Sequence, residues 1–211
     1  MKKKTWIQGI AAVMTLVAMG AGISVLMSSR ASALEIGKPA PSFTGKGSDG
    51  KDYNLSDYRG KYVVLEWLNH GCPYVAKHYD SGNMQGLQKK YTEKETIWLS
   101  VISSAPGKQG YSTPEEANAD VKKHNASPTA VILDPEGKIG RAYDAKTTPH
   151  MFVIDPKGDL IYAGAIDSKR STDQKDIPKS VNYVSQALDE AMAGKPVATA
   201  STQAYGCSVK Y

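Results

Sequence analysis

The chain has 211 residues, of which 41% are hydrophobic and 22% are charged, and this balance excludes a disordered or collagen-like protein. Its formal net charge is +5, but residues 1–33 hold four of the 26 basic residues and none of the 21 acidic ones. The remainder is therefore nearly neutral, which gives no reason to expect nucleic acid as a partner.

Residues 1–33 have the layout of a secretory signal peptide. Lys2 to Lys4 open the segment, an apolar and small-residue run covers 6–27, and the triplet Ala31-Ser32-Ala33 precedes Leu34. This order predicts cleavage after Ala33 and export. An uncleaved membrane anchor stays open as the alternative, because a run of about 20 apolar residues just spans a bilayer. Both alternatives place the remainder in an extracytoplasmic space, secreted or periplasmic. The protein is tethered to a membrane only if the leader is uncleaved.

The remainder predicts strands that alternate with helices. Proline-rich residues 37–43 indicate an extended arm, and Asp49-Gly50-Lys51 indicates a turn. After these we expect strands at 53–55, 61–68, 96–103 and 130–133, helices at 73–94 (with a kink at Ser81-Gly82), 113–125 and 138–143, a β-hairpin of 150–155 with 160–165, and a last helix at 181–193. This order predicts an α/β fold with a central mixed sheet that is covered on both faces.

Cys72 and Cys207 are the only cysteines of the chain. In an exported protein such a pair favours a disulfide, and a purely structural bridge would contribute about 4 to 5 kcal/mol in the chain-entropy model. Cys72, however, follows a buried strand and precedes Pro73 at the start of a predicted helix. The positive end of the helix dipole favours a thiolate there, which favours redox chemistry over a structural bridge.

The segment from Asn69 to Val75, placed between a strand and a helix, and Thr148-Pro149 before a strand resemble the thioredoxin fold. The arm at 37–43 and the segment 55–61 further resemble the alkyl hydroperoxide reductase and thiol-specific antioxidant family of peroxiredoxin-like redoxins. The resemblance covers about 34–197. It implies a thioredoxin-like three-layer α/β/α sandwich, and a cis Thr148-Pro149 peptide beside the reactive cysteine.

The chain also departs from these families. Val75 stands where thioredoxins have the second cysteine of their Cys-x-x-Cys motif, so a local disulfide is excluded. Asn69 and Leu65 stand where peroxiredoxins have a threonine and a proline around the peroxide-reactive cysteine. These departures weaken the expectation of peroxidase activity.

Glu66 falls where thioredoxins keep a buried acid, and burial in an apolar strand predicts a raised pKa that suits a proton shuttle. A glutamate that reaches solvent or pairs with a lysine is the alternative. His70, Cys72 and His150 suggest a Cys/His metal site only as a minor alternative, and we expect no metal and no cofactor. Lys77 and His78 are expected to be solvated residues of the helix, with an electrostatic effect of Lys77 on the Cys72 thiolate as the alternative.

Together these features predict an extracytoplasmic thiol oxidoreductase. Cys72 is the expected nucleophile toward a disulfide, a sulfenic acid or a hydroperoxide, with Pro73, Thr148 and Pro149 as supporting residues. Cys207 lies in residues 198–211, whose composition predicts a flexible tail able to bring this thiol to Cys72. The expected partners are a substrate protein or hydroperoxide and an external thiol electron donor. The alternative is a non-enzymatic binding module of the same fold with a structural Cys72-Cys207 bridge.

Overall fold

A computed structural model describes residues 34–211. The predicted signal peptide lies outside these residues. The strands are β1 (Thr44–Gly47), β2 (Asp52–Asn54), β3 (Val63–Trp67), β4 (Ile97–Ile102), β5 (Ala130–Leu133), β6 (Thr147–Thr148), β7 (His150–Ile154), β8 (Leu160–Gly164) and β9 (Cys207–Ser208). The helices are α1 (Pro73–Asp80), α2 (Asn83–Thr92), α3 (Pro114–Lys123), α4 (Lys138–Ala142) and α5 (Tyr183–Met192), with 3₁₀ turns η1 (Leu55–Tyr58) and η2 (Gln174–Lys179).

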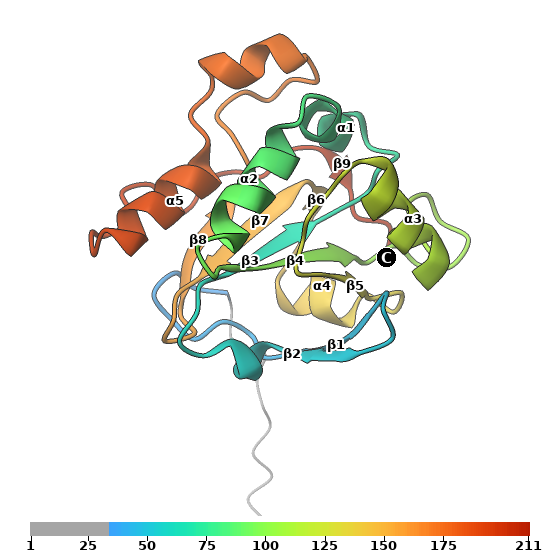
Figure 1. The fold of residues 1–211 in the computed structure, drawn as a ribbon, viewed down its shortest axis with the longest axis horizontal. Coiled ribbons are helices and arrows are strands. Elements are labelled where there is room, and N and C mark those ends of the chain that lie inside the picture. The colour runs from blue at the N-terminus through green and yellow to red at the C-terminus, as the bar shows by residue number, and fades with distance from the viewer. Residues whose placement is uncertain (1–33) are drawn as a thin grey trace, which may run out of the picture. The chain divides into compact units, whose positions relative to one another are not determined.

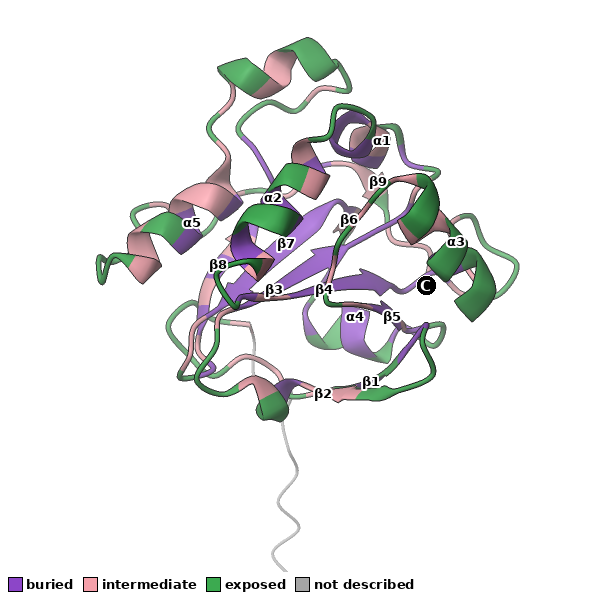
Figure 2. Cartoon of the chain, in the orientation of Figure 1, coloured by how far each residue is buried: buried purple, intermediate pink, exposed green. Residues whose placement is uncertain are grey.

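A seven-stranded mixed sheet forms the centre, in the order β2-β1-β5-β4-β3-β7-β8 (Figure 1). Strand β3 runs parallel to β4 and antiparallel to β7, and all five of its residues are buried. This burial agrees with its nearly continuous apolar sequence, which is typical of a central strand. The buried residues concentrate in this sheet, as Figure 2 shows.

Helices cover both faces of the sheet, as the sequence predicted. On one face, residues of α1, α2, α3 and α5 pack with Val64, Trp98 and Met151 in a single core cluster. On the other face, α4 and η1 pack against Leu65, Trp67 and neighbouring strand residues. The architecture is therefore the expected three-layer α/β/α sandwich.

Two local expectations are corrected. The helix predicted at 73–94 is two helices that separate at the expected kink, because Gly82 adopts a positive φ of 76° after the end of the first and before the second. Strand β1 was not predicted, since its sequence Thr-Gly-Lys-Gly has low strand propensity. Pairing with β2 and β5 holds it in the sheet, and a side chain at Gly45 would collide with Ile132.

The C-terminal segment (residues 198–211) is bound along the body of the protein, which corrects the expected flexible tail. Ala163 donates a backbone hydrogen bond to Ala200 and accepts one from Thr202, both at 3.1 Å. Further along, Lys210 O accepts a bond of 2.8 Å from Ala105 N, and the Tyr205 side chain is buried. Contacts with distant parts of the chain thus order a segment that has little secondary structure of its own.

Within residues 34–211, every helix is too short or too polar to cross a membrane.

Candidate active site

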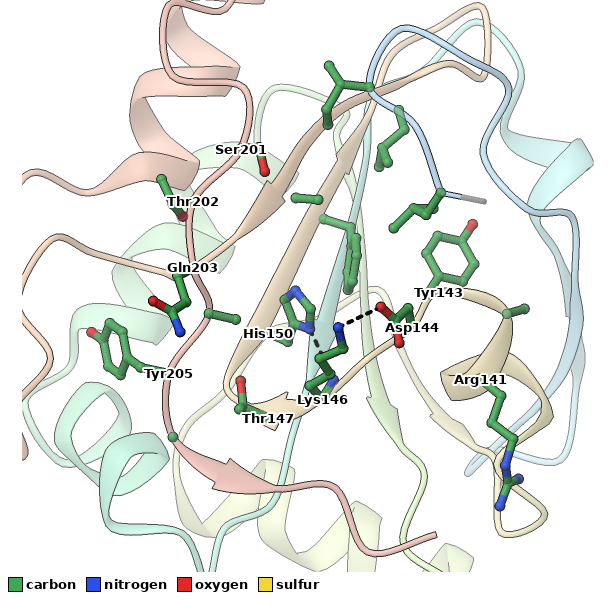
Figure 3. Close-up of a pocket in the computed structure, with 18 of the residues that line it drawn as sticks. Arg141, Tyr143, Asp144, Lys146, Thr147, His150, Ser201, Thr202, Gln203 and Tyr205 are labelled. Atoms are coloured by element: carbon green, nitrogen blue, oxygen red, sulfur yellow. Dashed lines mark hydrogen bonds and ion pairs between the residues drawn. The ribbon is translucent and has the colours of Figure 1, made fainter. Parts of the chain in front are cut away.

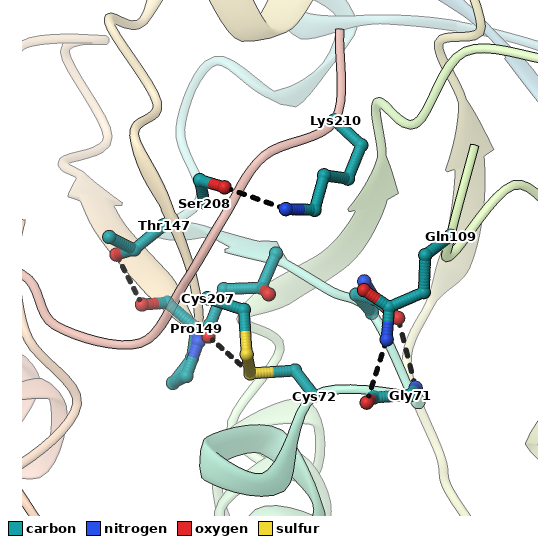
Figure 4. Close-up of a disulfide and its surroundings, with 10 residues drawn as sticks. Gly71, Cys72, Gln109, Thr147, Pro149, Cys207, Ser208 and Lys210 are labelled. Atoms are coloured by element: carbon teal, nitrogen blue, oxygen red, sulfur yellow. Dashed lines mark hydrogen bonds between the residues drawn. A yellow bond between two sulfur atoms is a disulfide. The ribbon is translucent and has the colours of Figure 1, made fainter.

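Cys72 and Cys207 form a disulfide, with their Cα atoms 5.9 Å apart (Figure 4). The two half-cystines differ in accessibility, because Cys72 is fully buried whereas Cys207 is partly exposed. A molecule approaching from solvent therefore reaches Cys207 more readily than Cys72.

Cys72 is the N-cap residue of α1, and Pro73 occupies the first turn, as the sequence predicted. The cysteine carbonyl accepts backbone hydrogen bonds from Val75 and Ala76, both at 2.9 Å. The Cys72 side chain makes no capping bond, and α1 has no acidic residue in its first turn. The positive end of the helix dipole therefore acts on the sulfur without a nearby helical carboxylate to offset it.

Cys207 is held beside Cys72 by a separate two-stranded sheet. Strand β9 pairs antiparallel with β6, so that Cys207 lies opposite Thr148 and Ser208 lies opposite Thr147. The carbonyl oxygen of Thr148 lies 3.1 Å from Cys72 Sγ, and the Thr148-Pro149 peptide is cis, as the family resemblance implied. The predicted residues Cys72, Pro73, Thr148, Pro149 and Cys207 thus converge on one place.

Gly206 allows this close approach. Its φ is 137°, and a Cβ atom at this position would collide with the carbonyl of Thr148. Any other residue would push the C-terminal segment away from β6. The Gly-Cys pair at 206–207 is the sequence signal that could have indicated an ordered contact.

The Glu66 side chain is fully buried on the α1 face of β3, which excludes the solvent-exposed or lysine-paired alternative. Its carboxylate accepts hydrogen bonds from Tyr79 Oη and Trp98 Nε1 at 2.8 Å each, and from Ser100 Oγ at 3.0 Å. Gln88 Nε2 donates a fourth bond at 3.2 Å. Burial raises the pKa of Glu66, and the four donors partly oppose this shift.

A buried ion pair next to the disulfide was missed from the sequence. Lys77 Nζ lies 3.1 Å from Asp167 Oδ2, and these side chains are 0% and 3% exposed. The expectation that Lys77 and His78 are solvated is therefore wrong: α1 turns both side chains into the core. No sequence pattern pairs Lys77 with Asp167, because the partners are 90 residues apart.

The histidines do not gather around Cys72. The ring of His70 stacks on that of His124 at 4.4 Å, whereas His150 packs on Phe152 at 4.4 Å. Across residues 34–211, no three His, Cys, Asp or Glu side chains are grouped as metal ligands. The Cys/His metal site considered from the sequence thus has no support in the described part of the chain.

A cavity of about 870 Å³ borders the C-terminal segment (Figure 3). Its walls combine apolar Phe152 and Leu160 with polar Thr202 and Gln203, and His150 also lines it. Burial lowers the pKa of His150 to about 4, so its imidazole is neutral at neutral pH. Neither cysteine is among the lining residues.

Comparisons with known proteins agree with this geometry. The model of the AhpC/TSA family matches residues 36–163. Peroxiredoxin-2 of Rattus norvegicus is 32% identical over 74% of this chain and 75% of its own, and the thiol-disulfide oxidoreductase ResA of Bacillus cereus is 30% identical over 63% and 71%. The crystal structure of an uncharacterized conserved protein from Geobacillus kaustophilus has a TM-score of 0.74, with 24% identity over 85% of this chain and 94% of that one. This last likeness concerns the fold alone.

Proposed function

This chain belongs to the AhpC/TSA family of redox proteins, and from that premise we propose that it is a thiol-disulfide oxidoreductase. Cys72 is the nucleophile in this proposal and Cys207 is the resolving cysteine. The observation that carries it is the disulfide itself, which joins the cysteine at a helix N-terminus to a cysteine on β9 beside Thr148.

The reaction begins from the dithiol form. The Cys72 thiolate attacks one sulfur of a substrate disulfide, forms a mixed disulfide with it and releases the other substrate sulfur as a thiolate. Cys207, as a thiolate, then attacks Cys72 Sγ, which forms the Cys72-Cys207 disulfide and releases the second substrate thiolate. The substrate is thereby reduced by two electrons and the protein is oxidised by two.

The substrate class follows from the segment that now covers Cys72. Strand β9 is an extended chain that pairs antiparallel with Thr147 and Thr148 and presents its cysteine to Cys72. A substrate that reaches the buried Cys72 must displace β9, after which the main-chain groups of β6 become free to pair with another extended segment. An unfolded or extended polypeptide that carries a disulfide fits this requirement.

An external dithiol donor restores the reduced form. Its thiolate attacks Sγ of Cys207, the more exposed residue of the pair, and Cys72 leaves as the thiolate that the helix N-terminus stabilises. The second donor thiol then releases Cys207. Attack on Cys207 is favoured over attack on Cys72, because it releases Cys72, and the thiol with the lower pKa is the better leaving group.

A disulfide between the only two cysteines of the chain agrees with an oxidising compartment, and residues 1–33 have the pattern of an export signal. We therefore place the protein outside the cytoplasm, secreted or periplasmic, with membrane tethering only if this leader is uncleaved.

Hydroperoxide reduction is the second candidate, because two relatives are named as peroxiredoxins. The residue at the peroxiredoxin threonine position, Asn69, uses its side-chain oxygen to accept a hydrogen bond of 2.9 Å from Gly71 N. This role in shaping the loop before Cys72 differs from holding a peroxide, so we rank disulfide exchange first.

Glu66 is proposed as the buried base that influences proton release during exchange. It lies on the same face of the sheet as Cys72, and its partner Tyr79 is on α1, the helix that Cys72 caps. The hydrogen bonds of the Glu66 carboxylate go to Tyr79, Gln88, Trp98 and Ser100 and none goes to a cysteine, so Glu66 acts through these partners and not by a hydrogen bond to the sulfur.

The test compares the wild-type protein with Cys72→Ser in two assays, reduction of a disulfide-linked peptide and consumption of an alkyl hydroperoxide. We expect wild-type protein to reduce the peptide and Cys72→Ser to be inactive. A redox titration in glutathione and dithiothreitol buffers then separates catalysis from a structural bridge. A disulfide that resists reduction far below about −300 mV would contradict the enzyme proposal and favour the binding module.

A further inference from the structure

The C-terminal segment is anchored just before Cys207 by a buried polar cluster, which we call the Asp167 cluster (Lys77, Asp167 and Tyr205). Lys77 Nζ donates to Asp167 Oδ2 at 3.1 Å and to the carbonyl of Lys169 at 3.1 Å. The Tyr205 hydroxyl donates to Asp167 Oδ1. The three residues are 1%, 3% and 5% exposed.

These side chains come from three separate parts of the chain that meet at the redox site. Lys77 belongs to α1, five residues after Cys72, and Asp167 follows β8. Tyr205 is two residues before Cys207, and its ring packs edge-on against Tyr74 at 5.7 Å. The helix that carries Cys72 therefore also carries the cation and the aromatic ring that hold the segment carrying Cys207.

Charge and protonation in the cluster are consistent with stable hydrogen bonds. Burial and the carboxylate of Asp167 raise the pKa of the Tyr205 hydroxyl far above its ordinary value, so it stays a donor. Burial lowers the pKa of the adjacent His78 to about 4, and its Nε2 lies 3.8 Å from Asp167 Oδ2. With His78 neutral, Lys77 supplies the positive charge that compensates Asp167.

None of these contacts needs the disulfide. We propose that the Asp167 cluster keeps the C-terminal segment docked as far as Tyr205 in the dithiol state, so that β9 can give way to a substrate while Cys207 stays within reach of Cys72. Lys77, Asp167 and Tyr205 are then positioning residues for the resolving step. This inference rests on the proposed function for its biological purpose, although the docking itself does not depend on any substrate.

Docking has a measurable consequence. The dithiol protein reacts with oxidised glutathione to give the protein disulfide and two molecules of reduced glutathione. The equilibrium constant of this reaction is the effective concentration of the Cys207 thiol at Cys72. If the segment undocks in the dithiol state, this constant is multiplied by the fraction of the dithiol protein that remains docked. A loss of stability shared by both redox states leaves the constant unchanged.

The test uses Tyr205→Phe, which keeps the ring that packs on Tyr74 and removes only the hydroxyl. We expect the loss of this hydrogen bond to a charged group to undock at least about nine-tenths of the dithiol form, so that the equilibrium constant falls at least about tenfold. The matched control is Tyr143→Phe. It removes a buried hydroxyl that donates to the Pro41 carbonyl at 2.7 Å, outside the C-terminal segment, and should change the constant by less than about twofold.

Amide hydrogen exchange on the phosphine-reduced proteins provides the direct measurement of docking. The wild-type segment should stay protected at 200–205 without the disulfide, and Tyr205→Phe should lose this protection. A reduced wild-type segment that exchanges like an unfolded peptide overturns the inference whatever the constant does, because a hydrogen bond made only in the disulfide form would also lower the constant in Tyr205→Phe. Unchanged protection together with an unchanged constant in Tyr205→Phe overturns the role of the Tyr205 hydroxyl in holding the segment. Neither the glutathione equilibrium nor hydrogen exchange involves a substrate. A wild-type protein without oxidoreductase activity would therefore contradict the proposed function, whereas these two measurements alone decide the docking.

Discussion

Cys207 lies directly opposite Thr148 in the antiparallel β6–β9 pair, and the carbonyl oxygen of the same Thr148 lies 3.1 Å from Cys72 Sγ. One main-chain residue thus contacts both half-cystines. This arrangement makes the C-terminal segment an internal occupant of the place where an extended substrate would have to bind.

The first prediction concerns the acidity of the two thiols. In reduced Cys207→Ser, the pKa of Cys72 should lie below the free value of about 8.5, because the N-terminus of α1 stabilises the thiolate. In reduced Cys72→Ser, Cys207 lies on a strand and should titrate near the free value. Iodoacetamide labelling rates against pH measure both, and a Cys72 that titrates at or above 8.5 would refute the activated thiol.

The second prediction concerns Glu66→Gln. Burial raises the folded-state pKa of Glu66 above 4.5, so its protonated form contributes stability that is lost as the pH rises through the raised pKa. Glutamine cannot ionise and does not suffer this loss. The unfolding free energy of the variant minus that of the wild type should therefore increase with pH, by up to about 1.4 kcal/mol per pH unit in that window.

Urea unfolding of the two oxidised proteins between pH 4 and 9 measures this difference. A difference that does not vary with pH would show that Glu66 ionises in the folded protein as it does in the unfolded chain. The rate of disulfide exchange over the same pH series tests the proposed role of Glu66 in proton release, since a purely structural role leaves the shape of the pH profile unchanged.

The third prediction concerns acid stability. The folded-state pKa of His150 is lowered to about 4 from 6.5, so its neutral form contributes stability that is present above pH 6.5 and lost as the pH falls toward 4. His150→Gln keeps an acceptor for the hydrogen bond from Lys146 N. Between pH 6.5 and 4 its unfolding free energy should fall less steeply than that of the wild type, by about 1.4 kcal/mol per pH unit.

Between pH 7 and 8 neither the folded nor the unfolded protein binds a proton at His150, so the two proteins should show parallel curves there. This range serves as the internal control. If the unfolding free energies of the two proteins stayed parallel down to pH 4, the folded protein would protonate His150 as readily as the unfolded chain does, which would contradict the prediction.

Much of the fold was predictable because the strong signals are local. The apolar runs at β3, β4 and β5, the capping box of Thr113 with Glu116, and the hairpin of β7 with β8 each depend on neighbouring residues. The place of Cys72 at a helix start was predictable for the same reason. The cis Thr148-Pro149 peptide, in contrast, came from the family resemblance and not from the local sequence.

The parts that sequence missed depend on contacts between distant segments. Strand β1 is held by its neighbours, and the C-terminal segment is held by β6, β8 and the Asp167 cluster. Composition alone assigned these last residues to a flexible tail, since no local pattern shows that Tyr205 meets Asp167. The burial of Lys77 was missed similarly, because a lysine on a short helix is usually solvated.

The most direct test of the account is the Cys207→Ser protein mixed with a disulfide-linked peptide in the absence of small thiols. Val75 stands where a local resolving cysteine would be, so we expect Cys72 to attack the peptide disulfide and to remain joined to the peptide. Intact mass spectrometry should show a mixed disulfide on Cys72 accumulating in Cys207→Ser, while the wild-type protein releases both peptide halves and becomes internally oxidised. Repeated turnover by Cys207→Ser without added thiol, or the absence of any adduct on Cys72, would contradict the account.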